Sequence, residues 1–411
     1  MKRRVVVTGL GIVSAAGNSV PAFWKFIRDG RCGIRRLSHF NEKRFTSQNA
    51  AEVSDFRLNP PLPPLHVKRL DRYAEFVLEA AWQALQHSQL ELSTARQRDD
   101  VGISFGTALG GLCNAEPEMR TLLESNKNSI SPYLALQVFG GAAHSNIAIA
   151  FGARGYATTN SNSCASGTVA IGEGLRAIRD GLADVMITGG AEAPLYPLTY
   201  GAFDVIRAMS RQDDPSLACR PFDANRDGFV MGEGSAALIL EELNHALRRG
   251  ALPLAEVCGY SLNNDAHHMT QSRPDLACTT RAMQDALRDA NVGPEQIDLI
   301  NAHGSGTKLN DENEARSIAA VFGARKVRVH ATKGYYGHPL GASGAIEGLL
   351  ATLMLQEGWV PHTLGCNNPE YPDWIDLLCE KGCTQPVGSI VSNSFGFGGI
   401  NSCLVFKKFV K

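Results

Sequence analysis

The sequence predicts an α/β fold in which layers of helices and strands stack on one another. Short runs of β-forming residues alternate with amphipathic segments along the chain, and this alternation is typical of layered α/β folds. No low-complexity linker interrupts the pattern, so the folding units are expected to share one body. A length of 411 residues is enough for two or three such units.

The first expected strand, Arg4–Gly9, follows a basic start that superficially resembles a signal peptide. Its apolar stretch is too soon interrupted by Thr8, Gly9 and Gly11 for that role, so it is better interpreted as a buried strand. Apolar residues at helical spacing predict helices over Ala74–Ser88 and Thr279–Ala290. The remaining expected strands are, in chain order, Val101–Phe105, Val185–Gly190, Ala236–Glu241, Ile297–Ala302 and Ser389–Asn393.

A faint internal duplication accompanies this pattern. A helix containing Ala84-Leu85 precedes a strand and a glycine turn ending at Gly106-Thr107, and a helix containing Ala286-Leu287 precedes a turn ending at His303-Gly304-Ser305. The repeat predicts two halves, residues 1–250 and 251–411, each containing a strand–helix unit.

The starts of two further helices also correspond. Cys164-Ala165-Ser166-Gly167 opens a helix in the first half, and Gly341-Ala342-Ser343-Gly344, shortly after His338, opens one in the second. Halves related by a pseudo-twofold axis bring corresponding helix starts together. The duplication therefore predicts that Cys164 and His338 lie around one pocket.

Composition excludes several classes of protein. Charged residues make up 20% of the chain and the formal net charge is −1, which argues against a nucleic-acid partner. No apolar run approaches the roughly 18 residues of a membrane span. The ten cysteines form no CxxC pair, so neither a disulfide framework nor a zinc site is expected. We therefore expect a cytoplasmic protein that does not associate with membranes.

Three motifs resemble cofactor or metal sites without completing them. Gly9–Ser14 lacks the third glycine of a dinucleotide fingerprint. The loop that begins at Asp223-Ala224-Asn225-Arg226-Asp227-Gly228 has Gly234 where a calcium loop needs a bidentate Glu. His267-His268 has no companion ligands, and adjacent side chains point in different directions. We therefore expect no cofactor and no metal.

One cysteine and two histidines form the strongest candidate for a catalytic site. Cys164 lies between a polar strand end and a helix of small residues, where the helix dipole is expected to lower the thiol pKa from about 8.5. His303 lies on a glycine-flanked turn after a buried strand, and Lys333 and His338 precede another helix. A nucleophile with two histidines on turns after strands is a recognised catalytic pattern.

The sequence resembles the β-ketoacyl-acyl-carrier-protein synthases of the thiolase superfamily, especially the type II elongating enzymes. The likeness covers essentially the whole chain and combines the Cys–His–His order with several glycine-rich motifs. It implies a duplicated, five-layered αβαβα fold and acyltransferase activity. The motifs are Val5–Gly11, Gly189-Gly190-Ala191-Glu192, Arg220–Asp223, Arg226–Gly234 and Asn393–Asn401.

This resemblance implies a role for each catalytic residue. Cys164 takes an acyl group from a carrier protein's pantetheine, and neutral His303 and His338 then donate hydrogen bonds to malonyl-carrier protein as it loses carbon dioxide. The N–H groups of Cys164 and Phe397 form the oxyanion hole. Lys333, paired with Glu314, supports the charges near His338.

The same resemblance implies residues for gating, binding and docking. Phe397 gates the acyl pocket together with the loop of Asp265. The expected partner is an acyl carrier protein, with a second subunit in a dimer. The positions that match are Thr270, Ser305 and Thr307 for pantetheine, Leu109 and Phe203 for the acyl pocket, and Lys68, Arg69 and Arg207 for carrier docking.

Departures from the family pattern leave the pathway open. Ser305 replaces a usual threonine, and the segment from His303 to Asp311 resembles the ketosynthase subunits of type II polyketide synthases; Ser163 and Val138–Gly141 also depart. Fatty-acid elongation is the first expectation, and the sequence leaves a homodimer and a heterodimer both open. The alternative is a polyketide or polyene ketosynthase that forms a heterodimer with a chain-length-factor relative. Cys164 argues against a silent chain-length factor, and Phe397 stands where a thiolase needs a second cysteine.

Overall fold

The structure is a computed structural model that describes residues 2–40, 42–124, 130–323 and 327–410. An eleven-stranded mixed sheet runs through it in the order β12-β10-β9-β14-β15-β8-β1-β7-β6-β4-β5. Two sets of strands make up this sheet. They meet where β1 (Val5–Ser14) and β8 (Ala255–Asn264) pair antiparallel along the short stretch Val5–Val7.

The first set runs from β1 to β5 (Ala157–Asn160). β4 (Val101–Gly106) pairs parallel with β5 and with β6 (Val185–Glu192). β7 (Gly234–Glu242) pairs antiparallel with β6 and with β1. The register of β4 on β6 places Gly106 beside Gly190, so both strands end at the same edge of the sheet.

The second set repeats this arrangement. β9 (Leu299–Asn301) pairs parallel with β10 (Arg328–His330) and β14 (Ser389–Gly396). β15 (Ile400–Lys407) pairs antiparallel with β14 and with β8, and the short β12 (Asp376–Leu377) adds to β10. β8, β15, β14, β9 and β10 thus correspond in order and direction to β1, β7, β6, β4 and β5. The predicted duplication of the fold is confirmed, while the boundary near residue 250 stays a prediction.

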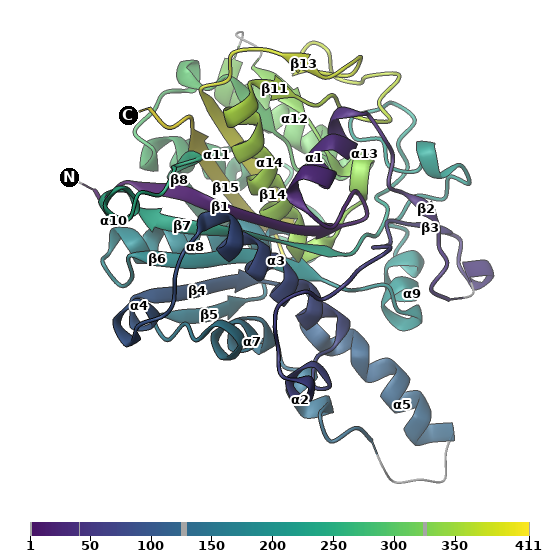
Figure 1. Cartoon of the computed structure of the whole chain (residues 1–411). Coiled ribbons are helices and arrows are strands. Elements are labelled where there is room, and N and C mark those ends of the chain that lie inside the picture. Colours follow the sequence, from purple (N-terminus) through teal and green to yellow (C-terminus); the bar gives the residue numbers. More distant parts are fainter. Residues whose placement is uncertain (1, 41, 125–129, 324–326, 411) are drawn as a thin grey trace.

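Helices complete five layers around the two sets of strands (Figure 1). On one outside, α3 (Arg72–Ser88) and α7 (Ala142–Phe151) share an apolar cluster with β4 and β6. On the other, α11 (Ala277–Asp289) and α12 (Lys308–Phe322) share one with β9 and β14. Between the sets, α8 (Ser166–Arg179) and α14 (Ser343–Glu357) pack together with β7 and β15. The predicted αβαβα class is confirmed.

The central helices have the composition that this burial requires. From Ser343 to Leu355, α14 is buried and is apolar on every side apart from its small polar residues and Glu347, as expected of a helix enclosed between two sheets. α3 instead has one apolar face, and Asp71 caps its first turn by accepting the Ala74 N–H at 2.9 Å. Every predicted strand and helix is present, whereas the sheet strands β5, β8, β10, β12 and β15 were not predicted.

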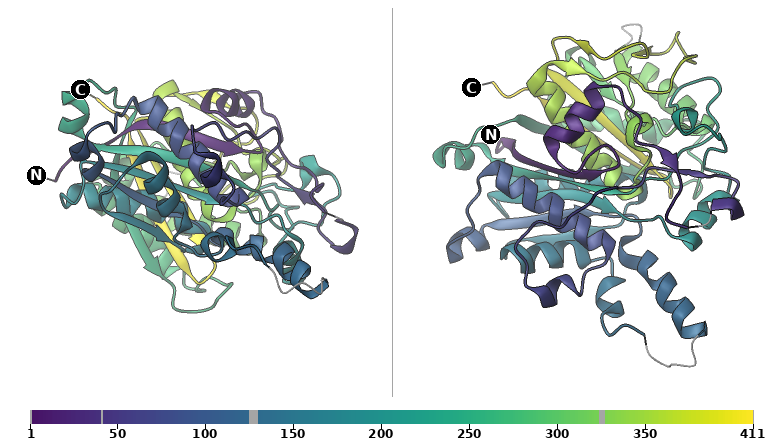
Figure 2. Two further views of the ribbon diagram at one scale, coloured as in Figure 1. Left: turned by 60° about the horizontal axis from the view of Figure 1, so that its bottom comes forward. Right: turned by 45° about the vertical axis from the view of Figure 1, so that its right-hand side comes forward.

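Shorter elements lie around these layers. In both views of Figure 2, α5 (Ala115–Glu124) extends away from the body. Among the described residues, every helix is too short or too polar to cross a membrane. The other elements are α1 (Val20–Arg28), α2 (Pro64–Val67), α4 (Ala95–Asp99), α6 (Leu134–Gln137), α9 (Pro197–Val205), α10 (Leu243–Arg248), α13 (Lys333–Tyr336), β2 (Arg35–Arg36), β3 (Asn49–Ala50), β11 (Trp359–Val360) and β13 (Cys383–Thr384).

Candidate active site

A cavity of about 590 Å³ opens at the edge of the sheet where β9 and β14 end. Both halves line it: Cys164 comes from the turn before α8, whereas His303 and His338 come from the second half. The Sγ atom of Cys164 lies 3.1 Å from Nε2 of His338. The prediction that corresponding helix starts bring Cys164 and His338 around one pocket is confirmed.

Cys164 lies in a strained turn. The 3₁₀ turn η3 (Ser163–Ala165) leads into α8, and Ser163 has a φ of 53°, which is uncommon for a residue other than glycine. Burial raises the pKa of the Cys164 thiol to about 11, and this effect outweighs the lowering by the Ser163 hydroxyl, the Lys333 charge and the Phe397 N–H. The predicted lowering of this pKa is therefore wrong, because the thiol is only 8% exposed.

The turn that carries His303 is fixed by Glu314. The N–H groups of His303 and Gly304 each donate to the Glu314 carboxylate at 2.8 Å, and the Asn393 amide donates at 3.1 Å. Burial raises the pKa of this carboxyl to about 7. Glu314 therefore binds the backbone beside the histidine, and its predicted pairing with Lys333 is wrong.

Lys333 pairs instead with Glu347, and both side chains are fully buried. Its ammonium also donates to the carbonyl of His303 and lies 3.4 Å from Nδ1 of that ring. Since an ammonium can only donate, Nδ1 of His303 must be the acceptor. A neutral His303 therefore carries its proton on Nε2. Glu347 stands on α14, which packs against the strands carrying the site, whereas Glu314 on α12 lies on the other side of β9.

Both histidines are neutral at physiological pH. Burial, followed by the nearby charge of Lys333, holds the pKa of each imidazole well below its ordinary value. Their rings lie 5.3 Å apart. Nδ1 of His338 lies 2.8 Å from the Ser343 hydroxyl, and the backbone N–H of His338 donates to the Val230 carbonyl at 2.7 Å. A neutral imidazole can donate a hydrogen bond from its ring N–H without carrying a positive charge.

The loop after β14 closes one side of the cavity. The Phe397 ring stacks on the Phe203 ring, with 6.1 Å between the ring centroids. The backbone N–H of Phe397 points to the Cys164 sulfur. Gly398 and Gly399 have φ values of 83° and 70°, which favour glycine. The Asp265 N–H donates to the Gly399 carbonyl at 2.8 Å, so the predicted partner loop contacts the Phe397 loop directly.

The remaining predicted residues divide into two groups. Thr270, Ser305, Thr307, Phe203 and Arg207 line the cavity, and the Ser305 and Thr307 hydroxyls lie 3.0 Å apart. The other predicted residues, Leu109, Lys68 and Arg69, do not line the cavity.

Leu109 packs in the apolar cluster that contains Cys164 and Phe203 without reaching the cavity wall. Lys68 and Arg69 are exposed near α2, where the Arg69 guanidinium lies over the Tyr133 ring. Arg207 is the predicted docking residue that stands at the site itself.

Two buried carboxylates at the site were not predicted as site residues. Glu347 had a usable signal, because an acid within the apolar stretch Ser343–Leu355 needs a buried partner. Glu192 was noted as part of a family motif, without any role. Its side chain is fully buried near the Cys164 turn.

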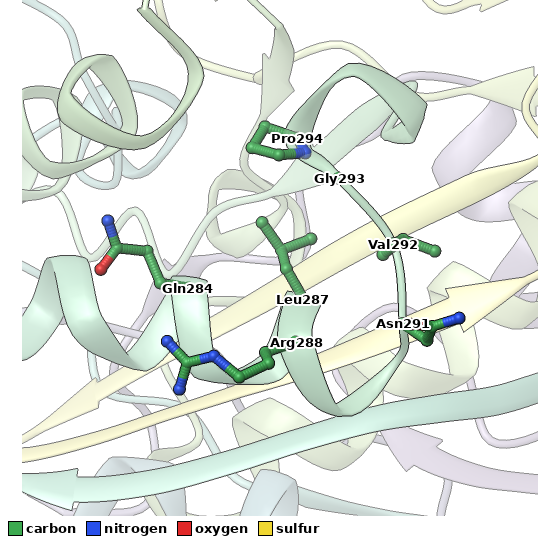
Figure 3. A pocket seen from close by; sticks show the side chains of 7 residues that line it. All are labelled: Gln284, Leu287, Arg288, Asn291, Val292, Gly293 and Pro294. Atoms are coloured by element: carbon green, nitrogen blue, oxygen red, sulfur yellow. The ribbon is translucent and has the colours of Figure 1, made fainter.

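A second hollow of about 420 Å³ lies away from this chemistry, at the end of α11 (Figure 3). Its one ionic side chain, Arg288, pairs with Asp285 at 2.7 Å. In the described ranges, no cluster of three or more His, Cys, Asp or Glu side chains could hold a metal ion. The lining residues are Gln284, Leu287, Arg288, Asn291, Val292, Gly293 and Pro294.

Comparison with known proteins is consistent across sequence and structure. Residues 2–246 match the family profile "Beta-ketoacyl synthase, N-terminal domain", and residues 254–367 match "Beta-ketoacyl synthase, C-terminal domain". The 3-oxoacyl-[acyl-carrier-protein] synthase 2 of Synechocystis is 40% identical over 99% of both chains.

Solved structures also resemble the chain over its full length. A ketosynthase of a type II polyketide synthase, solved with its acyl-carrier protein and bound to the hexaketide, is 33% identical, with a TM-score of 0.90 and complete coverage of both chains. The ishigamide ketosynthase/chain length factor is 32% identical, with a TM-score of 0.92 and the same coverage.

Proposed function

The chain belongs to the β-ketoacyl synthase family, and from that premise we propose that it elongates fatty-acyl chains. The reaction is a decarboxylative condensation of malonyl-acyl-carrier protein with an acyl group held on Cys164. The observation that carries this proposal is the 3.1 Å approach of the Cys164 sulfur to His338 in a cavity that His303 shares. No metal or organic cofactor takes part in the proposed steps.

In the first half-reaction, Cys164 is acylated. The Cys164 sulfur attacks the carbonyl carbon of the acyl-pantetheine thioester, and the bond from that carbon to the pantetheine sulfur breaks. The proton lost by the Cys164 thiol ends on the departing pantetheine thiolate, so no net proton is gained or lost. A proton on Nε2 of His338 would stabilise the attacking thiolate, and the Ser343 hydroxyl at 2.8 Å from Nδ1 favours that tautomer by donating to Nδ1.

In the second half-reaction, malonyl-carrier protein loses carbon dioxide. The electron pair of the broken C–C bond forms an enolate, whose oxygen accepts hydrogen bonds from Nε2–H of His303 and His338. The enolate carbon then attacks the acyl-Cys164 carbonyl, and the resulting oxyanion is stabilised by the N–H groups of Cys164 and Phe397. Expulsion of the Cys164 sulfur as a thiolate releases the β-ketoacyl product, and uptake of one proton from solvent regenerates the thiol.

Surrounding residues support these steps. Lys333, held by Glu347, fixes the His303 tautomer, and Glu314 fixes the backbone of the same turn. Phe397 gates the cavity, with Asp265 holding its loop.

The binding residues stand along the cavity. Thr270, Ser305 and Thr307 bind the pantetheine arm, and Phe203 contacts the acyl chain with Leu109 packed behind it. The hydroxyls suit a pantetheine amide, which needs hydrogen-bond donors and acceptors, whereas an acyl chain needs apolar walls.

The proposal is tested by incubating the chain alone with acyl- and malonyl-carrier proteins and analysing carrier-bound products by mass spectrometry. A β-ketoacyl product two carbons longer than the starter is expected. Normal acyl loading on Cys164 without such a product would contradict the condensing assignment.

Ser305 favours a second candidate function, a ketosynthase subunit of a type II polyketide or polyene synthase. The ketosynthase that works with a chain length factor has a similar fold.

For either function we propose a dimer. α5, α6 and α7 pack on η2 (Gly110–Asn114) and expose apolar side chains, and β5 ends the sheet. These exposed residues are Leu112, Met119, Leu123, Leu136 and Ile149. A product formed only when a cysteine-less relative is added would favour the polyketide or polyene candidate.

We also propose a cytoplasmic location, in keeping with ten free cysteines.

Arg207 is proposed to dock the acidic carrier protein, since its exposed guanidinium stands at the cavity mouth. Arg207→Glu is expected to raise the KM for malonyl-carrier protein about 10-fold, because a rim charge reversal weakens an electrostatic encounter. The KM for a malonyl-pantetheine thioester without the protein should stay unchanged. Steady-state kinetics with both substrates measure this difference.

The matched variant is Arg69→Glu, since Arg69 is equally exposed but lies away from the cavity. A smaller rise for Arg69→Glu is expected. An equal rise in KM for both substrates in Arg207→Glu would show that Arg207 contacts pantetheine rather than the carrier protein.

A further inference from the structure

Glu192 carries a fully buried carboxylate to which the proposed steps assign no role. It ends β6, and each of its oxygens accepts two hydrogen bonds from neutral donors. Oε1 accepts from the Thr107 hydroxyl at 3.0 Å and the Leu109 N–H at 3.1 Å. Oε2 accepts from the Ala108 N–H at 2.7 Å and the Gly341 N–H at 3.0 Å.

Three of these donors belong to the turn after β4, which contacts the Cys164 segment. The Thr107 carbonyl accepts from the Ser166 hydroxyl at 2.9 Å, and the Ala108 carbonyl accepts from the Ser161 hydroxyl at 3.1 Å. These two serines flank Cys164. Through its backbone, the turn therefore links Glu192 to the nucleophile.

The fourth donor belongs to the turn that follows His338. Gly341 lies in the 3₁₀ turn η7 (Leu340–Ala342), which leads directly into Ser343. The Ser343 hydroxyl lies 2.8 Å from Nδ1 of His338. One carboxylate thus joins the segment beside the nucleophile, in the first half of the chain, to the segment that orients His338, in the second.

The turn after β4 and the turn at Gly341 pack so closely that no side chain would fit at Gly341. A Cβ atom at Gly341 would lie 2.5 Å from the Ala108 nitrogen and 2.7 Å from Oε2 of Glu192. The backbones are therefore in direct contact, and the carboxylate fills the space between their N–H groups.

We propose that Glu192 is a positioning residue that fixes the Cys164–His338 distance across the two halves. This role rests on the proposed function, whereas the effect of the Glu192 charge on the thiol, which serves as a second readout, does not. Burial raises the pKa of Glu192 to about 7, so the group is ionised above pH 8. Its charge then raises the pKa of the Cys164 thiol further.

Other titratable groups surround this carboxylate and the thiol. Lys333 favours the thiolate, opposite to Glu192. Since these neighbours remain in a variant at position 192, a change in thiol reactivity there reports the missing charge. The neighbours are Asp71 and Tyr73 near the start of α3, Cys113 of η2, and Lys333, His303 and His338 on the side of the second half.

The test measures alkylation of Cys164 by iodoacetamide from pH 7 to 10, followed by mass spectrometry of the Cys164 peptide, together with steady-state condensation. Glu192→Gln is expected to be alkylated about 3- to 10-fold faster at pH 8.5, because loss of a like charge favours the thiolate. Its kcat should fall about 10- to 100-fold with an unchanged KM, since displacement by about 1 Å costs up to 10²-fold.

Glu192→Asp keeps the charge and is expected to retain the wild-type alkylation profile while recovering part of the lost kcat. This variant also provides the readout if Glu192→Gln does not fold, because its kcat should then lie below the wild-type value at an unchanged alkylation profile. Wild-type alkylation and kcat in both variants, with only a lower Tm, would overturn the proposal.

Glu241→Gln is the matched control. Glu241 is also fully buried, but it accepts from Thr8, His245 and Arg249 near the end of β7, whereas Glu192 pairs with Gly234 at the start of that strand. It should be destabilised without any change in Cys164 alkylation. Faster alkylation of Glu192→Gln in a protein that forms no β-ketoacyl product would support the charge effect and overturn the condensing function instead.

Discussion

Replacing Cys164 with alanine is expected to abolish acyl loading and to lower condensation by at least about 10⁴-fold, because the Cys164 sulfur forms the covalent acyl intermediate. Cys164 is the cysteine that lines the cavity, and its sulfur faces His338 at 3.1 Å. Mass spectrometry of the protein after incubation with an acyl-carrier protein measures loading, and product analysis measures condensation.

Two variants make this result specific. Cys32→Ser changes a half-buried cysteine outside the cavity and should load normally. His303→Ala should also load, since the Cys164 sulfur contacts His338, but its condensation should fall about 10²- to 10³-fold through the loss of one donor to the enolate. Acyl transfer to another residue in Cys164→Ala would contradict the assignment of the nucleophile.

Much of the fold was accessible from the sequence because its signals are local. The runs at Val185–Gly190 and Ala236–Glu241 are apolar enough to predict strands buried between helices. The small residues after Cys164 and His338 predicted corresponding helix starts, and the duplicated topology places those starts side by side.

The errors at the site have a common physical origin. The pKa of Cys164 depends on burial by segments far away in sequence, which outweighs the local effect of the helix start. The partner of Lys333 depends on which helix occupies the central layer. Glu314 and Glu347 are both acids on helices after β9, and only the packing of α14 between the sheets brings Glu347 to the ammonium.

Local motifs also predicted which residues belong to the site better than they predicted the hydrogen-bond partners of those residues. The turn at His303 was recognised from its glycines, yet the carboxylate that binds its N–H groups lies eleven residues away on α12. Glu192 belongs to a motif that was recognised, but its donors come from two turns in different halves. Such contacts follow from topology, which a linear pattern does not contain.

Lys333→Met is expected to destabilise the protein by about 3–5 kcal/mol, because it leaves the Glu347 carboxylate buried without its cation. Without Lys333 the pKa of Glu347, which burial already raises to about 7, should rise further. The folded state then binds a proton that the unfolded state releases above its ordinary carboxyl pKa. Stability of the variant should therefore fall more steeply than that of the wild type as pH rises from about 5 to 9. Urea unfolding across this range measures the effect.

The double variant Lys333→Met/Glu347→Leu separates stability from catalysis. It removes the buried charge as well as the ammonium, so most stability should return, and the additional loss of stability between about pH 5 and 9 should disappear. Condensation should stay about 10²- to 10³-fold low, because Nδ1 of His303 has lost the donor that keeps its proton on Nε2. Lys25→Met, which breaks the exposed pair with Asp29, should change stability by less than about 1 kcal/mol. Full condensation in the double variant would show that Lys333 only balances Glu347 and does not set the His303 tautomer.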